Sequence, residues 1–234
     1  MTSNRNAPSL PRWIIVLIVL CCAIQAALTL ADLLGYGIPM RMERSTGLPW
    51  RMSFYVSLPI EQVVFQLLGF WSGLLHGGQA IFPGQPAAMF LSYGLLHAGL
   101  AHITMNMLSL AAVARELGRF VTARQMALIY LISQIAAAAL FALMSPQGGP
   151  MVGASGAIFG LAGALIGQAV IWRRWRGLSM RPVWRGVLII GGLNLAMTLL
   201  MPSIAWEAHL GGAIAGFAMG IALPLRRDRE MDED

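Results

Sequence analysis

Six long apolar runs constrain this chain more than any other feature of its sequence. They cover about residues 13–34, 87–113, 126–144, 155–172, 183–201 and 208–225. A helix that crosses the hydrocarbon core of a bilayer needs about 20 predominantly apolar residues, and each run meets or approaches that length. Only 11% of the residues are charged, against roughly 25% in a soluble domain. The sequence therefore predicts an integral membrane protein in contact with the lipid bilayer.

The arginines mark the ends of these runs. All 16 of the Lys and Arg residues are arginine, and 13 of them lie before the first run, between the second and third, between the fourth and fifth, or after the sixth. Because cytoplasmic loops carry an excess of Lys and Arg, this pattern predicts six spanning helices with both chain ends in the cytoplasm. We expect a multi-pass protein of a bacterial inner (plasma) membrane.

The apolar runs also divide the chain into parts. We predict a cytoplasmic segment at residues 1–12, a six-helix membrane domain at 13–225 and a charged cytoplasmic tail at 226–234. The first external loop, about 35–86, is long and predicted to be partly helical. Within it, 53–77 is a poor span because it contains a proline and several polar residues, so we expect an amphipathic segment in the interface, anchored by two aromatic side chains, Phe70 and Trp71.

The composition excludes several other classes of function. A net charge of +6 could suit nucleic acid, but the charges flank apolar runs and no nucleic-acid module is present, so no nucleic-acid partner is expected. The two cysteines, Cys21 and Cys22, are adjacent in the first run, where they point apart on a helix and pack as small apolar residues. No spacing suits a metal, and we expect neither a metal nor a cofactor.

A few polar residues lie within the apolar runs, where a polar side chain is costly and marks a functional site. They are His97, His102, Asn106, Ser155, Asn194 and His209. By the charge pattern, the fourth and sixth helices both begin on the external side. Ser155 and His209 are therefore expected at comparable depth, each in the first turn of its helix.

Ser155 and His209 could form a nucleophile and its base. A serine hydroxyl is a weak nucleophile until a neighbouring base takes its proton, and histidine has a suitable pKa. The two side chains can meet only if their helices approach closely, and small residues four apart permit such contacts in membranes. The glycines with this spacing include Gly156, Gly160, Gly212 and Gly216. The sequence predicts a Ser–His dyad without a third carboxylate.

The second run supplies candidate donors for a developing oxyanion. His102 and Asn106 are four residues apart and share one face of a helix, and each can donate a hydrogen bond. The backbone N–H of Ser155, at a helix start, is a third donor. His97 faces elsewhere, and we expect it to brace the long loop through a hydrogen bond to backbone.

Each of these residues has a simpler interpretation when it is taken alone. Ser155 could be a packing residue, His209 a helix cap, and His102 with Asn106 an interhelical hydrogen-bonding pair. Asn194 is interpreted as a helix–helix contact. The catalytic interpretation is favoured only jointly, because independent packing roles would not place a nucleophile, a base and oxyanion donors on one side of the bilayer.

Three motifs in order resemble the rhomboid family of intramembrane serine proteases. "HAGLAHITMN" is similar to the family's H-x4-H-x3-N, "GASGAIFG" to its G-x-S-G-x-x-F/Y-G, and "AHLGGAIAG" to its A-H-x-x-G-x-x-x-G. The resemblance covers about residues 87–225. It implies an all-α membrane protein, a six-transmembrane-helix rhomboid-like bundle.

The resemblance also implies roles for individual residues. Ser155 would be the nucleophile, His209 the base, and His102 with Asn106 the oxyanion-hole partners. Phe159 matches the aromatic residue that packs against the histidine ring. The supporting residues that flank them in the motifs are Gly153, Gly156 and His97.

One departure concerns the first external loop. Many members of the family carry a Trp-Arg pair shortly before the second helix, where this chain has Ala88 and Met89, and its Trp50 and Arg51 come too early. The role of the loop is therefore left open.

The expected function is that of an intramembrane serine endopeptidase, which cleaves transmembrane segments of membrane-protein substrates. Its substrates would be helices with helix-weakening residues near their outer ends. The alternatives are a catalytically inactive rhomboid-like protein that binds membrane clients and a small transporter or channel, which would favour paired charges within the membrane. The sequence does not give the oligomeric state.

Overall fold

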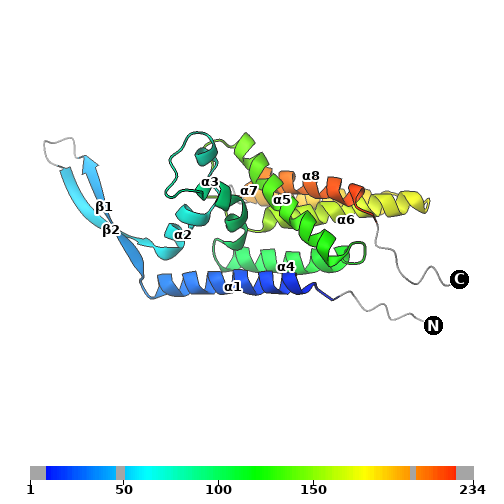
Figure 1. Cartoon of the computed structure of the whole chain (residues 1–234), viewed down its shortest axis with the longest axis horizontal. Helices are drawn as coiled ribbons and strands as arrows, with labels where there is room; N and C mark the ends of the chain where they lie inside the picture. Colours follow the sequence, from blue (N-terminus) through cyan, green and yellow to red (C-terminus); the bar gives the residue numbers. More distant parts are fainter. Residues whose placement is uncertain (1–8, 46–50, 201–203, 225–234) are drawn as a thin grey trace.

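The computed structural model describes residues 9–45, 51–200 and 204–224. Six long helices dominate it (Figure 1): α1 Arg12–Leu33, α4 Leu100–Leu117, α5 Ala123–Met144, α6 Ser155–Trp175, α7 Arg181–Leu200 and α8 Trp206–Ala222. They correspond to the six predicted runs. Shorter elements precede α4: β1 Gly37–Ser45, β2 Arg51–Pro59, α2 Ile60–Leu68, the 3₁₀ turn η1 Ser72–Leu75, α3 Gln85–Ser92 and the 3₁₀ turn η2 Tyr93–Leu95. The predicted tail 226–234 and most of segment 1–12 lie outside the described residues.

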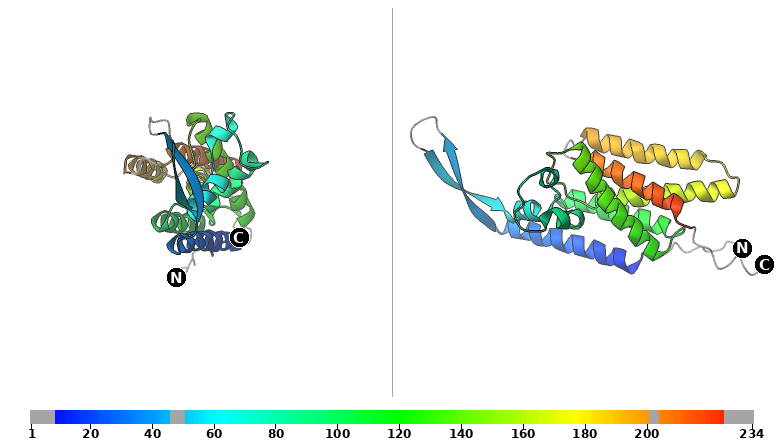
Figure 2. Two further views of the ribbon diagram at one scale, coloured as in Figure 1. Left: turned by 90° about the vertical axis from the view of Figure 1, so that its left-hand side faces the viewer. Right: turned by 45° about the horizontal axis from the view of Figure 1, so that its top comes forward.

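The long helices run back and forth, so that α1 begins and α8 ends at the same end of the molecule (Figures 1 and 2). By length and composition, α1, α5 and α6 can each cross a membrane, and α3 with η2 and α4 would make a fourth, bent span. The 17 residues of α8 fall short of the ~20 that a full span needs. The passage of α7 and α8 through the bilayer stays a prediction from the charge pattern.

The second apolar run was expected as one helix over about 87–113, and this is wrong. The chain bends by 82° between α3 with η2 and α4. The bend lies at residues 96–99, where Leu96 is extended and Gly99 has a φ of +86°, a conformation that favours glycine because it has no Cβ. The break puts His102 in the first turn of α4.

The first external loop also differs from the prediction. An antiparallel hairpin pairs Gly37 with Pro59 and Ser45 with Arg51, and it projects away from the helices (Figure 1). Residues 53–59 are therefore strand, and helix begins only at α2. In "MSFYVSL", apolar residues recur at alternate positions, which is the period of a strand.

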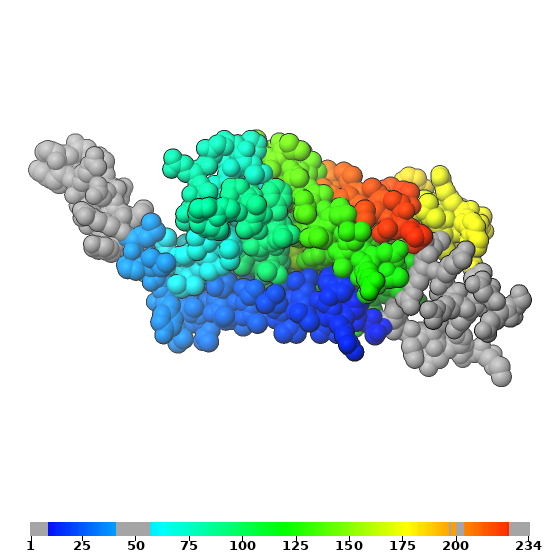
Figure 3. Space-filling model, viewed as in Figure 1, coloured from blue at the N-terminus to red at the C-terminus, as the bar shows by residue number. Residues whose placement is uncertain are grey.

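Phe70 is wrongly predicted as an interface anchor. It is fully buried, with its ring edge-on to those of Tyr93 and Phe141, and its backbone pairs with that of Met151. Trp71 is partly buried and donates to the carbonyl of Phe65. This part of the loop is thus packed between α1 and α5 at the hairpin end of the bundle, as the cyan and teal surface in Figure 3 shows.

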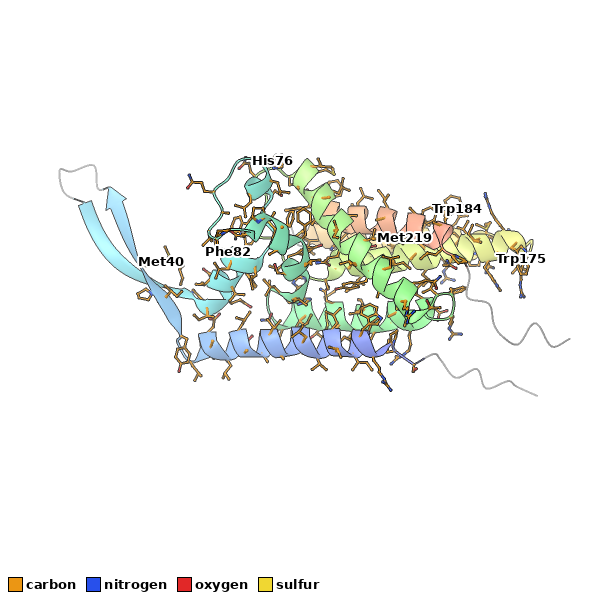
Figure 4. The ribbon with its side chains drawn as sticks, viewed as in Figure 1. Met40, His76, Phe82, Trp175, Trp184 and Met219 are labelled. Carbon is orange, nitrogen blue, oxygen red and sulfur yellow. The ribbon has the colours of Figure 1, made fainter. Side chains whose placement is uncertain are left out.

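The side chains distinguish the two ends of the molecule (Figure 4). Met40, His76 and Phe82 lie toward the hairpin end, and Trp175 and Trp184 lie toward the opposite end, where α6 stops and α7 starts. Helices α6 and α8 both begin on the hairpin side. The two candidate catalytic residues, which lie in their first turns, are therefore at the same end.

Helix α6 lies at the centre of the bundle and touches α8 backbone to backbone. A Cβ atom added to Gly212 or to Gly216 would overlap the carbonyl group of Gly156 or of Gly160, respectively. Nothing larger than hydrogen fits at these positions. The glycine spacing thus sets the distance between the two helices.

Replacing Gly212 by valine should lower the stability of the bundle, because the added side chain must push α8 away from α6. Overpacking of this kind costs about 1–3 kcal/mol. The control is Gly192→Val on α7, where a Cβ meets no atom within 4 Å. We expect a lower thermal unfolding midpoint in detergent micelles for Gly212→Val only, and equal midpoints would contradict the packing role of the glycine contact.

Candidate active site

Ser155 and His209 are hydrogen-bonded across the contact between α6 and α8. The Oγ of Ser155 lies 2.8 Å from Nε2 of His209. Ser155 is the first residue of α6, and His209 lies in the first turn of α8 with 3% of its surface exposed. The distance suits proton transfer from a hydroxyl to an imidazole nitrogen.

The glycine contact lies directly beside this pair. Gly156 follows Ser155, and a Cβ there would overlap the side chain of Ala137. Gly212 is three residues after His209 and lies against Gly156. The serine and the histidine meet because their backbones meet within one helical turn.

The ring of Phe159 stacks on the imidazole of His209. The ring centroids are 4.3 Å apart and the planes differ by 9°. Phe159 is four residues after Ser155 and therefore lies on the same face of α6. The stack holds the plane of the imidazole while its edge faces the serine.

His102 approaches Ser155 from α4. Its Nδ1 accepts a hydrogen bond from the backbone N–H of Ala98 at 3.2 Å, so in the neutral ring the proton is on Nε2. The Nε2 side lies against Gly153, where a Cβ atom would come within 2.9 Å of the ring. Gly153 also has a φ of +121°, so both its conformation and its neighbour require glycine.

Asn106 lies one turn further along α4 and is 6% exposed. Its Nδ2 donates to the carbonyl of His102 at 3.0 Å, which leaves the second N–H of the amide available to another acceptor. Its Oδ1 is buried and has no hydrogen-bond partner among the described residues. The amide can therefore still bind a group that enters the site.

These residues line one cavity of about 700 Å³. Ser155, His209, His102 and Asn106 all contribute to its wall, which is otherwise mostly apolar. Glu207 supplies the only formally charged side chain of this lining, and its carboxylate accepts a hydrogen bond from the Ser145 hydroxyl at 2.8 Å. The glutamate is thus held at the end of α5.

His97 is placed differently from the prediction. It is 1% exposed, and neither ring nitrogen has a hydrogen-bond partner of ordinary geometry among the described residues. The expected hydrogen bond to loop backbone is therefore absent. Instead the ring packs edge-on against His102, with centroids 5.3 Å apart.

The interpretation of Asn194 as a helix–helix contact is confirmed, and its partner on α8 is His209 of the site. The Oδ1 of Asn194 lies 2.8 Å from Nδ1 of His209. The sequence signal for such a role is that Asn194 is a polar residue within an apolar run predicted to span the membrane. The rotation of α7 about its axis decides which side of the helix faces His209, and the apolar pattern of that run does not fix the rotation.

Comparison with known proteins gives a consistent result. The profile of the rhomboid domain matches residues 85–226. The rhomboid protease GluP of Bacillus subtilis is 34% identical over 131 residues, which are 56% of this chain and 25% of GluP. RHOMBOID-like protein 4 of Arabidopsis thaliana is 34% identical over 147 residues, which are 62% of this chain and 36% of that protein.

A fungal relative is more distant. Rhomboid-type serine protease 2 of Emericella nidulans is 27% identical over 129 residues, which are 55% of this chain and 25% of that protein. The chain thus spans about a quarter to a third of the length of these three relatives. All the site residues described above lie within the matched domain, residues 85–226.

Replacing Gly153 by alanine should displace His102 and strain the backbone before Ser155. Such strain costs of order 1–3 kcal/mol, so we expect a serine-directed fluorophosphonate to label Ser155 about tenfold more slowly. Gly77→Ala is the control, because Gly77 also has a positive φ, +92°, but a Cβ there meets no atom within 4 Å. Equal labelling rates for the two variants would show that the Gly153–His102 contact is unimportant.

Proposed function

Because this chain belongs to the rhomboid family, we propose that it is an intramembrane serine endopeptidase that cleaves transmembrane segments of membrane proteins. The observation that carries the proposal is the 2.8 Å hydrogen bond between Ser155 Oγ and His209 Nε2 in a largely apolar cavity. The relatives include one protein named as a rhomboid protease and one named as a rhomboid-type serine protease. The activity, substrates and partners of this chain are part of the proposal.

In the proposed reaction, His209 Nε2 takes the hydroxyl proton of Ser155 as Oγ attacks the carbonyl carbon of a peptide bond. The tetrahedral intermediate collapses, the C–N bond breaks, and the imidazolium returns the proton to the leaving amine. Water then attacks the acyl-enzyme ester with His209 again as base. The second product is a carboxylic acid, and Ser155 regains its proton.

Three groups can stabilise the oxyanion of the intermediate. The backbone N–H of Ser155 is at the start of α6, where no turn precedes it to supply an acceptor, and the helix dipole favours negative charge there. His102 carries its proton on Nε2, and Asn106 has a free amide N–H, as the hydrogen bonds to their other atoms require. Donors that are already oriented in a low-dielectric site stabilise such charge strongly.

A substrate helix must unwind before it can react, because its carbonyl groups are engaged in helical hydrogen bonds. Helix-weakening residues near the outer end of a substrate helix would ease this step. The cavity opens near the starts of α6 and α8, which the arginine pattern assigns to the external side. We propose that residues 13–225 form the membrane domain of a bacterial inner-membrane protein with both chain ends cytoplasmic.

The test of the function is loss of proteolysis on removing the nucleophile or the base. Ser155→Ala and His209→Ala should each lower cleavage of a model transmembrane substrate in proteoliposomes by at least about a thousandfold, as for other serine-protease sites. Ser155→Ala should also abolish labelling by a fluorophosphonate. The control is Ser92→Ala, whose hydroxyl bonds only to carbonyls of Leu68 and Ala88.

Cleavage that survives Ser155→Ala would overturn the proposal. A wild-type protein that binds membrane proteins but neither cleaves them nor reacts with the probe would instead be an inactive client-binding member of the family. Proteolysis and labelling together distinguish these two cases.

The proposed orientation predicts which sites are accessible in sealed cells. In a Cys21→Ala, Cys22→Ala background, Gln147→Cys should react with a membrane-impermeant maleimide from outside, because 147 follows α5 on the side where α6 begins. Arg176→Cys, at the opposite end of α6, should react only after the cells are opened. The reverse pattern would show that the orientation is opposite to the one proposed. Reaction of both sites from outside would show that α6 does not span the membrane.

A further inference from the structure

Asn194 is hydrogen-bonded to His209, but the reaction proposed above gives it no role. It lies on α7, which is at the margin of the bundle beside α8 (Figure 2). Its neighbour Leu195 and Leu188, about two turns before Leu195 on the same side of the helix, are 61% and 74% exposed. In the described part of the chain, the bond from Asn194 to His209 is the one side-chain hydrogen bond between α7 and another helix.

We propose that Asn194 is a positioning residue that fixes the tautomer and the orientation of the His209 ring. This inference rests on the proposed function, since it concerns the base of that reaction. It adds a third member to the Ser155–His209 pair, carried by a helix from which no described residue lines the cavity.

The hydrogen bonds of the ring determine where its proton lies. An amide oxygen only accepts hydrogen bonds, so the 2.8 Å contact with Asn194 Oδ1 requires the proton on Nδ1 of His209. Nε2 then has a lone pair, directed at Ser155 Oγ. With the other tautomer, Nε2–H could not take the serine proton, and His209 would not be a base.

Two contacts together define the orientation of the imidazole. Phe159 stacks on its face with the planes 9° apart, which limits tilting but permits rotation within the plane. The bond from Asn194 to Nδ1 fixes that rotation. Since Nδ1 and Nε2 are rigidly linked, the same bond directs Nε2 at Ser155.

An amide suits this place better than a carboxylate. A charge inside a membrane is costly, whereas asparagine supplies an acceptor oxygen without a charge. Its backbone carbonyl also accepts a bond from the Thr198 hydroxyl at 2.8 Å. Thr198 thus bonds within its own helix, which makes it a control for general disturbance of α7.

The test compares three variants that have similar side-chain volumes. Asn194→Leu removes the acceptor, Asn194→Asp keeps it, and Thr198→Val removes a hydroxyl that does not touch His209. In cleavage of a model transmembrane substrate, we expect Asn194→Leu to lower kcat about tenfold, the worth of one hydrogen bond. KM should stay within about twofold, because the change affects the chemical step and not the binding of substrate.

A spectroscopic measurement tests the tautomer without any turnover. In protein labelled with ¹⁵N-histidine, the imidazole nitrogen shifts distinguish Nδ1–H from Nε2–H. The signals of His209, one of four histidines, are assigned by their loss in His209→Gln. We expect His209 to carry Nδ1–H in the wild type, in Ser155→Ala, in Asn194→Asp and in Thr198→Val. Asn194→Leu should show a mixture of the two tautomers.

The outcomes separate this inference from the proposed function. The inference is overturned if wild-type His209 carries its proton on Nε2, or if Asn194→Leu retains both the tautomer and the kcat of Thr198→Val. A wild-type protein that has Nδ1–H but cleaves nothing would overturn the proposed function and leave the positioning role standing. Thermal unfolding of each variant identifies any loss of kcat that reflects misfolding, and the ¹⁵N shifts of the folded fraction still decide the tautomer.

Discussion

The contact between α6 and α8 is the constraint on which the rest of the site depends. The two backbones touch because Gly212 lies against the carbonyl group of Gly156 and Gly216 against that of Gly160. In a membrane there is little hydrophobic drive to bring helices together, and close packing of small residues takes its place. Ser155 and His209 are adjacent to this contact, so the packing of the bundle and the geometry of the hydrogen bond have one cause.

Around this pair, α4 and α7 contribute further side chains to the site. The bend before α4 places His102 beside Gly153, where the backbone N–H of Ala98 holds its proton on the side facing the cavity. The margin helix α7 brings Asn194 to the other edge of the His209 ring. The site is thus assembled from segments that are distant in sequence, and the hydrogen bonds of His102 and His209 join those segments.

The sequence predicted most of the long helices and the pairing of Ser155 with His209 because both depend on local patterns. Long apolar runs define spans, and serine or histidine beside glycines four apart defines a close contact. The bend could not be predicted, since "HAG" gives a glycine but not its φ. The helix–helix contact of Asn194 was predicted, but its partner His209 could not be, because the partner depends on the rotation of α7 about its axis. The alternation of apolar residues in "MSFYVSL" is the local signal for the hairpin, since it has the period of a strand and not of a helix.

The position of Ser155 as the first residue of α6 has a consequence for how the site could change. The first helical hydrogen bond to a preceding carbonyl is that of Ile158 to Ala154, so the amides of the three residues before Ile158 have no backbone acceptor among the described residues. A serine placed one turn deeper would face the same side of the helix, but its backbone N–H would already be hydrogen-bonded to a carbonyl one turn earlier. In the proposed reaction, a nucleophile and its anion-binding amide can coincide only at a helix end, which would tie the depth of the chemistry to the membrane level at which α6 begins.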